Sequence, residues 1–287
     1  MINIKNNRET IGIIFALTAY LSFSFLDVIQ KTLIIYYSVF QLLFIKYCFT
    51  LCLSLIESKR KKNYQFYISS NWKLQLFRSI LSILESGCFV LAFKYLSLAD
   101  AHSIGGLTPI IVVIFSYIFL KEKITLKIWI AIFFGFIGVL IIMRPGLTIF
   151  DPKSLIPLTA ALILGLYQVV TRKVSENDEN ETSLFYTAIT GIIIMGFFCF
   201  FYWQPIILKF LPFFIGVGVF YSLGLYLQIV ALSKARASII QPFHYTLIFW
   251  AIILGYIFYQ DIPDMFTIIG ATIIASSGIY IFIKQNN

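Results

Sequence analysis

Five ionisable side chains lie within long apolar runs of the sequence: Asp27, Lys46, Arg78, Glu85 and His244. In an apolar environment a charged side chain costs roughly 2.5–3.5 kcal/mol even on lenient insertion scales, so it faces a cavity or a partner. A buried carboxylate such as Glu85 needs a proton, a cationic partner or a bound ligand. These five residues are therefore the first candidates for ligand binding or proton transfer.

These residues also have structural interpretations, which the sequence leaves open. Asp27 can lie near the end of its helix, where water solvates it, and the long stem of Lys46 can carry its ammonium to a membrane surface. Arg78 and Glu85 are seven residues apart, which places them on one helix face about 10 Å from each other. Glu85 can then pair with Lys46 or with Arg78 instead of serving a substrate.

Two prolines interrupt apolar runs in corresponding parts of the two halves of the chain. Pro109 follows Thr108, and Pro242 lies two residues before His244. A proline inside a helix frees a backbone carbonyl, which a membrane bundle tolerates where the backbone lines a cavity. Broken helices of this kind indicate a ligand site near the middle of the membrane. Further side chains expected to line this site are Gln168, Tyr221, Gln228, Tyr245 and Trp250.

The chain lacks the patterns of a catalytic or metal centre. It has only two histidines, and its four cysteines fall within apolar runs without CxxC or Cys/His spacing. No HExxH motif, no phosphate-binding Gly-rich loop and no Ser or Cys nucleophile paired with His occurs. We therefore expect neither an enzyme nor a bound metal or cofactor.

The elements that position these residues are predicted to be membrane-spanning helices. The chain is 60% apolar and 12% charged, with a mean hydropathy of +0.90, whereas soluble domains are about 45–50% apolar and about 25% charged. An apolar run of about 18 residues or more is typical of a membrane span. We predict ten spans, at 11–30, 34–56, 74–95, 101–120, 125–143, 154–172, 183–202, 208–231, 236–259 and 265–283.

The net charge of +9 does not indicate a nucleic-acid partner, because the basic residues follow a membrane topology. With the N-terminus in the cytosol, 16 of the 22 Lys and Arg residues fall on the inner side, five on the outer side and Lys46 within a span. This bias follows the positive-inside rule and places both termini in the cytosol. The KRKK run at 59–62 is then a topological anchor, and the acidic stretch 176–181 a solvated connection. We expect a multi-pass protein of the cell (inner) membrane.

Segments of the first half recur in the same order in the second half. LTAYLSFSFLDVIQKT at 17–32 matches LTAALILGLYQVVTRK at 158–173, which pairs Asp27 with Gln168. YLSLADA at 95–101 matches ALSKARA at 231–237, and KEKI at 121–124 matches YQDI at 259–262. These matches predict an all-α membrane protein of two five-helix repeats, 1–150 and 151–287. An odd number of helices in each repeat inverts the second repeat relative to the first.

At LFRS…AFKYLSLADAHSIGGLTPIIVVIFSYIFLKEKIT (76–125) and ALSKARASIIQPFHYTLIFWAIILGYIFYQDIPD (231–264) the chain resembles the drug/metabolite transporter superfamily, in its ten-helix branch of paired EamA domains. Members show a broken helix with a mid-helix proline, followed by a helix that ends in L-x-E. Pro109 and Pro242 match the prolines and Glu122 matches the acidic position, whereas the second copy has Gln260 and Asp261 there. The resemblance covers the whole chain and implies a carrier that works by alternating access.

Three residues depart from the pattern of the family that this chain resembles. Lys46 and His244 stand where relatives often carry Arg, and Glu85 replaces what is commonly a small residue. Positive charge at Lys46 and at a protonated His244 favours a substrate with a carboxylate or another anionic group. We therefore look for the substrate where the two halves differ.

We expect a secondary transporter of a small polar metabolite, either an amino-acid-like or other carboxylate-bearing compound or a cofactor-type metabolite such as S-adenosylmethionine or riboflavin. Its expected partners are this substrate, the lipid bilayer and a proton or an exchange substrate, and the chain acts as a monomer or a homodimer. Two alternatives remain. One is efflux of lipophilic cations with Asp27 and Glu85 as counter-charges, and the other is a lipid scramblase.

Overall fold

The structure is a computed structural model that describes residues 4–143, 153, 155–260 and the short pieces 265–266, 268–270, 272–273 and 276–277. The described residues form α-helices, one short 3-10 helix and connecting turns, without a β-strand among them. The all-α prediction is confirmed for this part of the chain. The predicted junction between the repeats and most of the predicted tenth span lie outside the described residues.

The described helices follow the first nine predicted spans. They are α1 (Ile4–Leu33), α2 (Val39–Lys61), α3 (Trp72–Tyr95), α4 (Leu98–Gly105), α5 (Thr108–Leu120), α6 (Leu126–Met143), α7 (Leu155–Val174), α8 (Asn180–Tyr202), η2 (Leu208–Phe210), α9 (Leu211–Lys234), α10 (Ala237–His244) and α11 (Thr246–Tyr259). α2 begins five residues later than predicted, because the side chain of Ser38 caps its first turn by accepting a hydrogen bond from the backbone of Gln41. The fourth and ninth predicted spans are each divided into two helices.

These two breaks correspond to each other in the two halves. α4 and α10 are eight residues long and lie 139 positions apart, so His102 corresponds to Gln241. At the same offset, α5 and α11 both end in left-handed residues, Lys121 and Gln260, with φ of 53° and 57°. The break in each helix is therefore a property of the repeat.

The predicted equivalence of the two prolines is wrong. Pro109 lies in the first turn of α5, where a missing backbone N–H costs little. Pro242 lies inside α10, close to its end at His244, and corresponds by the 139-residue offset to Ser103. Each half has a proline beside its break, on opposite sides of it.

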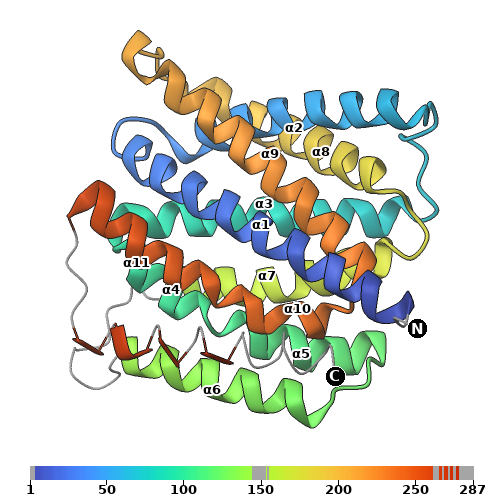
Figure 1. The fold of residues 1–287 in the computed structure, drawn as a ribbon. Helices are drawn as coiled ribbons and strands as arrows, with labels where there is room; N and C mark the ends of the chain where they lie inside the picture. Colours follow the sequence, from blue (N-terminus) through green and yellow to red (C-terminus); the bar gives the residue numbers. More distant parts are fainter. Residues whose placement is uncertain are drawn as a thin grey trace.

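The packing of the helices is symmetric between the two halves (Figure 1). α1 packs against α9, α10 and α11, and its counterpart α7 packs against α3, α4 and α5, which are the counterparts of those helices. α4 packs on α11 as α10 packs on α5, and α2 packs against its own counterpart α8. Exchange of the halves maps these contacts onto themselves, as a two-fold relation requires.

Small residues allow α2 to approach α8 and α9 closely. A Cβ atom at Gly191 would lie 2.3 Å from the ring of Tyr47, and a Cβ atom at Gly218 would lie 2.2 Å from the ring of Phe49. Glycines at such crossings let helix backbones approach in a membrane, where close packing drives association. This contact fixes the position of α2 and therefore of Lys46, the residue before Tyr47.

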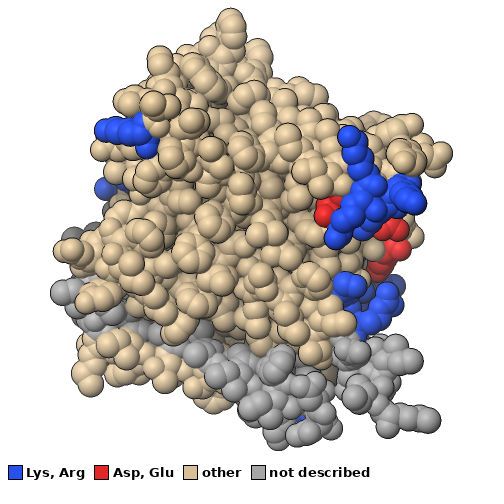
Figure 2. Space-filling model, turned by 45° about the horizontal axis from the view of Figure 1, so that its top comes forward, with Lys and Arg blue, Asp and Glu red and all other residues tan. Residues whose placement is uncertain are grey.

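The surface of the bundle is that of a membrane protein. Seven helical stretches of the described residues are long and apolar enough to cross a membrane, with α5 and the first part of α6 as shorter apolar helices. Large apolar side chains on these helices, such as Phe200 at 84% and Phe197 at 63%, are exposed. Figure 2 shows a broad uncharged surface with Lys, Arg, Asp and Glu gathered near its edges. Such a belt fits contact with lipid.

The acidic stretch between α7 and α8 makes specific contacts and is not only a solvated connection. The Glu181 carboxylate is buried and receives the Lys61 ammonium at 2.7 Å. Asp178 accepts hydrogen bonds from the backbone N–H of Ser70 at 2.8 Å and from the Gln75 amide at 2.8 Å. The loop after α2 and the loop after α7 are thereby joined on one side of the bundle, and the end of the KRKK run takes part in that contact.

Candidate functional site

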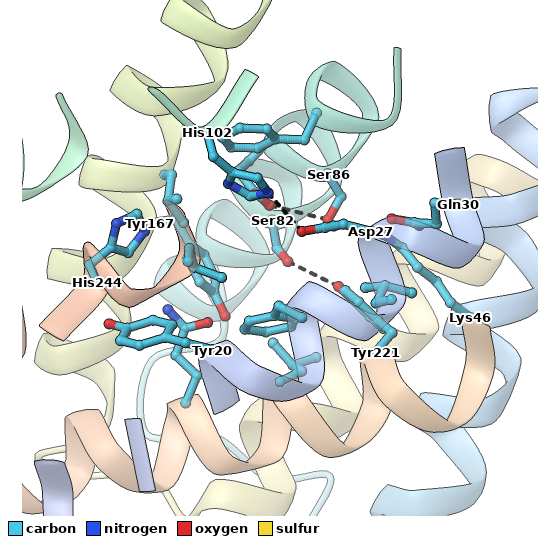
Figure 3. A pocket seen from close by; sticks show the side chains of 18 residues that line it. Tyr20, Asp27, Gln30, Lys46, Ser82, Ser86, His102, Tyr167, Tyr221 and His244 are labelled. Carbon is cyan, nitrogen blue, oxygen red and sulfur yellow. Dashed lines mark hydrogen bonds and ion pairs between the residues drawn. The ribbon is translucent and has the colours of Figure 1, made fainter. Parts of the chain in front are cut away.

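A buried polar cavity lies between helices of both halves (Figure 3). The space that the centre of a water molecule can reach amounts to about 80 Å³, which holds several waters. Six of the predicted site residues line this cavity: Asp27, Lys46, Glu85, Tyr221, Gln228 and His244.

Asp27 of α1 is buried and contacts His102 of α4. The His102 Nε2 atom lies 2.9 Å from the Asp27 Oδ2 atom. The imidazole ring packs against the rings of Phe89 and Phe93, with centroid distances of 5.9 and 5.8 Å. Asp27 is therefore not solvated at a helix end, and its partner is a second titratable group that was not predicted from the sequence.

Lys46 of α2 points into the bundle. Its side chain is buried, with 1% of the residue exposed, so the snorkelling alternative is excluded. The ammonium lies 4.0 Å from the centroid of the Tyr221 ring, a cation–π contact. No Asp or Glu oxygen of the described residues lies within 4.0 Å of it, although Asp27 and Glu85 are near enough to act on its charge. Among the described residues, the ammonium therefore has aromatic rings but no carboxylate in direct contact.

Glu85 of α3 lines the cavity with a carboxylate that is only partly engaged. Its Oε2 atom accepts a hydrogen bond from the Ser86 hydroxyl at 3.1 Å. Within the described residues it forms an ion pair with neither Lys46 nor Arg78. The predicted alternative of a structural ion pair is therefore not realised. The side chains of Lys46 and Glu85 thus line one cavity without an ion pair between them.

Arg78 lies outside the cavity and joins helices. Its guanidinium donates to the Ser183 carbonyl and the Thr187 hydroxyl at 2.5 Å each, to the Gln75 side-chain oxygen at 3.1 Å and to the Tyr167 hydroxyl at 3.3 Å. The residue is fully buried. Because neutral acceptors of α3, α7 and α8 occupy its donors, Arg78 is positioned to hold these three helices together.

The second half has a polar contact in the place of the Asp27–His102 contact. The Gln241 amide donates to the Gln168 side-chain oxygen at 2.8 Å, joining α10 to α7. Gln168 matches Asp27 in the sequence repeat, and Gln241 corresponds to His102 at the 139-residue offset. The Gln168 Nε2 and Gln241 Oε1 atoms are buried without a partner among the described residues. Polar side chains therefore join corresponding pairs of helices in the two halves, α1 to α4 and α7 to α10.

The remaining predicted residues do not line the cavity. Thr108 is buried and its hydroxyl lies 3.5 Å from the Ala161 carbonyl, and the Tyr245 hydroxyl donates to the Ile132 carbonyl at 3.4 Å. Trp250 packs edge-on against Phe249. Pro109, Pro242 and Gln168 are also absent from the lining. His244 lines the cavity with its ring edge-on to Tyr20, at a centroid distance of 5.3 Å.

Sequence reasoning did not select Tyr20, Ser82, Ser86 and His102, which also line the cavity. Helical spacing could have found Ser82, because it lies three residues before Glu85 and so on the same face of α3. Comparison of α4 with α10 could have found His102. Within the described residues, no group of three or more His, Cys, Asp or Glu side chains is arranged to hold a metal ion.

The arrangement of two matched halves around a polar cavity agrees with the comparison to protein families. The model of the EamA-like transporter family matches the chain twice, at residues 10–144 and 154–283. The chain belongs to the EamA-like transporter family. The seven membrane-spanning candidates among the described helices fit this membership.

Named relatives of this EamA-like chain carry different substrates. It is 27% identical over 177 residues to the S-adenosylmethionine uptake transporter of Rickettsia bellii, a match that covers 62% of this chain and 61% of that protein. It is 29% identical to the riboflavin transporter of Vibrio cholerae over 61% of this chain and 59% of that protein. It is 24% identical to the pseudopaline exporter of Pseudomonas aeruginosa over 69% and 71%. The match thus spans about three fifths of the first two relatives.

A solved structure shares the fold of this EamA-like chain almost completely. The match has a TM-score of 0.77 and covers 94% of this chain and 95% of the solved chain, a protein of which a crystal structure is known. The two sequences are only 14% identical. The likeness therefore supports the fold alone and carries no information about a substrate.

Proposed function

We propose that this chain is a secondary active transporter of a small metabolite that carries both a carboxylate and an amino group. The observation that supports this substrate class most strongly is the pair of unmatched charges in one buried cavity. The Lys46 ammonium has no carboxylate within 4.0 Å among the described residues, and the Glu85 carboxylate accepts a hydrogen bond from the Ser86 hydroxyl but forms no ion pair with a described residue. A zwitterion would neutralise both groups at once.

The chemistry of the cavity assigns a role to each charge. Lys46 would bind the substrate carboxylate, and Glu85 would bind the ammonium, because charge-assisted hydrogen bonds are stronger than neutral ones. S-adenosylmethionine, for which the relative from Rickettsia bellii is an uptake transporter, has an amino-acid end of this kind. Riboflavin, for which the relative from Vibrio cholerae is a transporter, carries neither charge at neutral pH. The amino-acid class is therefore preferred.

The mechanism that we propose is alternating access of two inverted five-helix halves, 1–150 and 151–287, with ten spans in total. The symmetric helix contacts and the matched breaks of α4–α5 and α10–α11 support it. Two similar halves of opposite orientation can exchange conformations, which opens a shared site first to one side and then to the other. The protein would lie in the cell (inner) membrane with both termini in the cytosol.

A second candidate is efflux of lipophilic cations, which the excess of carboxylates in the cavity favours. Asp27 and Glu85 would serve as counter-charges. Two observations oppose this candidate. Lys46 adds a buried positive charge to the same cavity, and His102 already contacts the Asp27 carboxylate. A scramblase would need a polar groove that faces lipid, whereas these polar groups line a cavity inside the bundle.

Binding to the purified protein tests the substrate class. A ligand that binds only the folded state raises the melting temperature, so thermal unfolding is measured with L-methionine, S-adenosylmethionine, riboflavin and tetraphenylphosphonium. We expect stabilisation by L-methionine or S-adenosylmethionine, reduced in Lys46→Met and in Glu85→Gln. The matched controls Lys94→Met and Glu176→Gln alter exposed residues and should respond like the wild type. Stabilisation by tetraphenylphosphonium alone would favour the cation pump.

A further inference from the structure

The Asp27–His102 contact is a buried pair of titratable groups that the proposed substrate binding leaves without a role. The 2.9 Å distance between His102 Nε2 and Asp27 Oδ2 allows two states that differ by one proton. In one state a neutral imidazole donates its N–H to the carboxylate, and in the other an imidazolium does so. Both states keep the hydrogen bond, so the contact can accept and release a proton without being broken.

The second half of the molecule shows that a helix contact at this place does not need charge. There, two amides, Gln168 and Gln241, join α7 to α10 as Asp27 and His102 join α1 to α4. An amide pair cannot titrate near neutral pH. The amide pair therefore suffices for helix packing in the second half. In the first half, the carboxylate of Asp27 and the imidazole of His102 stand in its place and add a group that can bind a proton.

The charges of the cavity give this proton a function. The cavity-lining ionisable side chains of the described residues are the carboxylates Asp27 and Glu85, the ammonium of Lys46, and the imidazoles of His102 and His244, besides tyrosines. With neutral imidazoles, two negative charges face one positive charge, and a zwitterionic substrate adds none. One proton on the Asp27–His102 contact brings the sum to zero, which lowers the cost of enclosing these groups in a membrane.

The polar and charged groups of the cavity around this contact come from several helices. Lys46 of α2 acts on the charge of Asp27, Asp27 acts on that of Glu85 in α3, and His102 acts on that of His244 in α10. α9 presents the Tyr221 hydroxyl and the Gln228 amide, α7 presents the Tyr167 hydroxyl, and α11 presents the Tyr259 hydroxyl, which donates to the Val28 carbonyl next to Asp27.

We propose that the Asp27–His102 contact is the proton-binding site of this transporter, distinct from the Lys46 and Glu85 substrate groups, and that one proton moves with each zwitterion. This inference rests on the proposed function. α4 is the short first part of a broken helix, so a change in the charge of His102 acts directly on an element that a change of access has to move.

The test uses proteoliposomes with the membrane potential clamped at zero and labelled L-methionine, a zwitterion without net charge, as the probe. Exchange of the probe at equal pH on both sides is measured first. A pH difference of one unit is then applied in each direction. Coupling to one proton predicts about tenfold accumulation in one direction, because one pH unit corresponds to a tenfold change in equilibrium constant.

The decisive variant copies the second half into the first. Asp27→Gln combined with His102→Gln recreates an amide pair like Gln168–Gln241, keeps a polar contact and removes the titration. We expect its accumulation to stay near onefold under either pH gradient. The control Gln241→Asn, which shortens the amide contact of the second half, should keep the response to pH. If the double variant does not fold, Asp27→Asn and His102→Gln are measured singly with the same expectation.

The outcomes separate this inference from the proposed function. If the wild type does not exchange the probe, both the proposed function and the proposed proton site are contradicted. Exchange without any effect of the pH gradient would leave the transporter standing and overturn the coupling. Tenfold accumulation in the double variant, lost instead in Glu85→Gln, would move the proton site to Glu85 and overturn the assignment to Asp27 and His102.

Discussion

The ionisable residues in the bundle interior are of two kinds: those whose polar atoms are hydrogen-bonded by other protein groups, and those whose polar atoms face a cavity. Arg78 has neutral acceptors for its guanidinium on three helices, whereas Lys46 and Glu85 keep polar atoms directed at a cavity. A buried charge that the protein itself satisfies contributes to packing, and one that faces a cavity is available to a ligand. Arg78 therefore belongs to the scaffold.

Arg78→Gln tests this role. Loss of the guanidinium removes its hydrogen bonds to α7 and α8, and a hydrogen bond from a charged group contributes about 1.5–3 kcal/mol. We expect a clear fall in the melting temperature, measured in detergent, with substrate binding retained by the molecules that fold. The control Lys173→Gln removes an exposed ion pair with Glu176, which is worth about 0–1 kcal/mol. An Arg78→Gln protein with wild-type stability and no substrate binding would place Arg78 in the site.

Asp178 gives a prediction for pH, because it lies outside the membrane spans. Burial raises the pKa of its carboxyl, but hydrogen bonds from Ser69, Ser70 and Gln75 outweigh burial and hold the pKa below its ordinary value of 3.8. A lowered pKa stabilises the folded protein above the ordinary value, and this contribution is lost as the pH falls through the lowered pKa. We expect wild-type protein to melt above Asp178→Asn at pH 6, with the difference shrinking toward pH 3. A difference that does not change with pH would contradict this account.

At the scale of elements, the short helix α10 is held at its N-terminus by a residue of the other half. The Glu122 carboxylate accepts hydrogen bonds from the backbone N–H groups of Ala237 and Ser238 at 3.1 Å each, and from the Ser238 hydroxyl at 2.5 Å. Arg236, beside it, pairs with Glu9 of α1 at 3.1 Å. A carboxylate at this position satisfies the unpaired N–H groups of the helix and complements its dipole.

Glu122→Ala should therefore loosen α10. Loss of a helix cap costs about 0.5–2 kcal/mol, and since α10 carries His244 into the cavity, we expect weaker substrate binding as well as a lower melting temperature. Ser97→Ala is the matched control, because it removes from the start of α4 a hydroxyl that accepts from the Asp100 N–H at 3.0 Å within its own half. Equal effects of the two substitutions on substrate binding would show that the contact of Glu122 with α10 matters no more for binding than the Ser97 cap of α4.

The elements were more predictable from the sequence than the site. Apolar runs define the helices, because a membrane span must be apolar over its whole length. The same uniformity hides which face of a helix points inward, and so Trp250 and Thr108 were expected at a cavity that they do not line. His102 was not selected because its role depends on a partner 75 residues away in α1. An alignment of α4 with α10 pairs His102 with Gln241, but it requires the bounds of both helices, which the structure provides.

At the scale of the whole molecule, the contacts of one half are repeated in the other with the helices exchanged. This symmetry brings the N-terminal end of α1, the loop after α2 and the loop after α7 to one side. The contact of Glu9 with Arg236 and the contact of Lys61 with Glu181 lie on that side. On the opposite side, the Gln41 amide donates to the Gln204 carbonyl at 2.8 Å. From the positive-inside rule we propose that the first side faces the cytosol.

Labelling of cysteines tests this orientation. In a chain whose four native cysteines are replaced by alanine, Lys209→Cys should react with a membrane-impermeant maleimide in intact cells. Lys73→Cys should react only after the membrane is permeabilised. Both positions are exposed, so they differ only in the side of the bundle on which they lie. The reverse pattern would invert the proposed topology.

The central claim is that Lys46 and Glu85 bind the two ends of one substrate that the halves pass across the membrane. Counterflow of labelled L-methionine or S-adenosylmethionine in proteoliposomes tests it most directly. We predict saturable exchange by the wild type and by Lys94→Met and Glu176→Gln. In Lys46→Met and Glu85→Gln we predict exchange reduced about tenfold or more, because a hydrogen bond to a charged group is worth about 1.5–3 kcal/mol. Wild-type exchange by both cavity variants would contradict the claim.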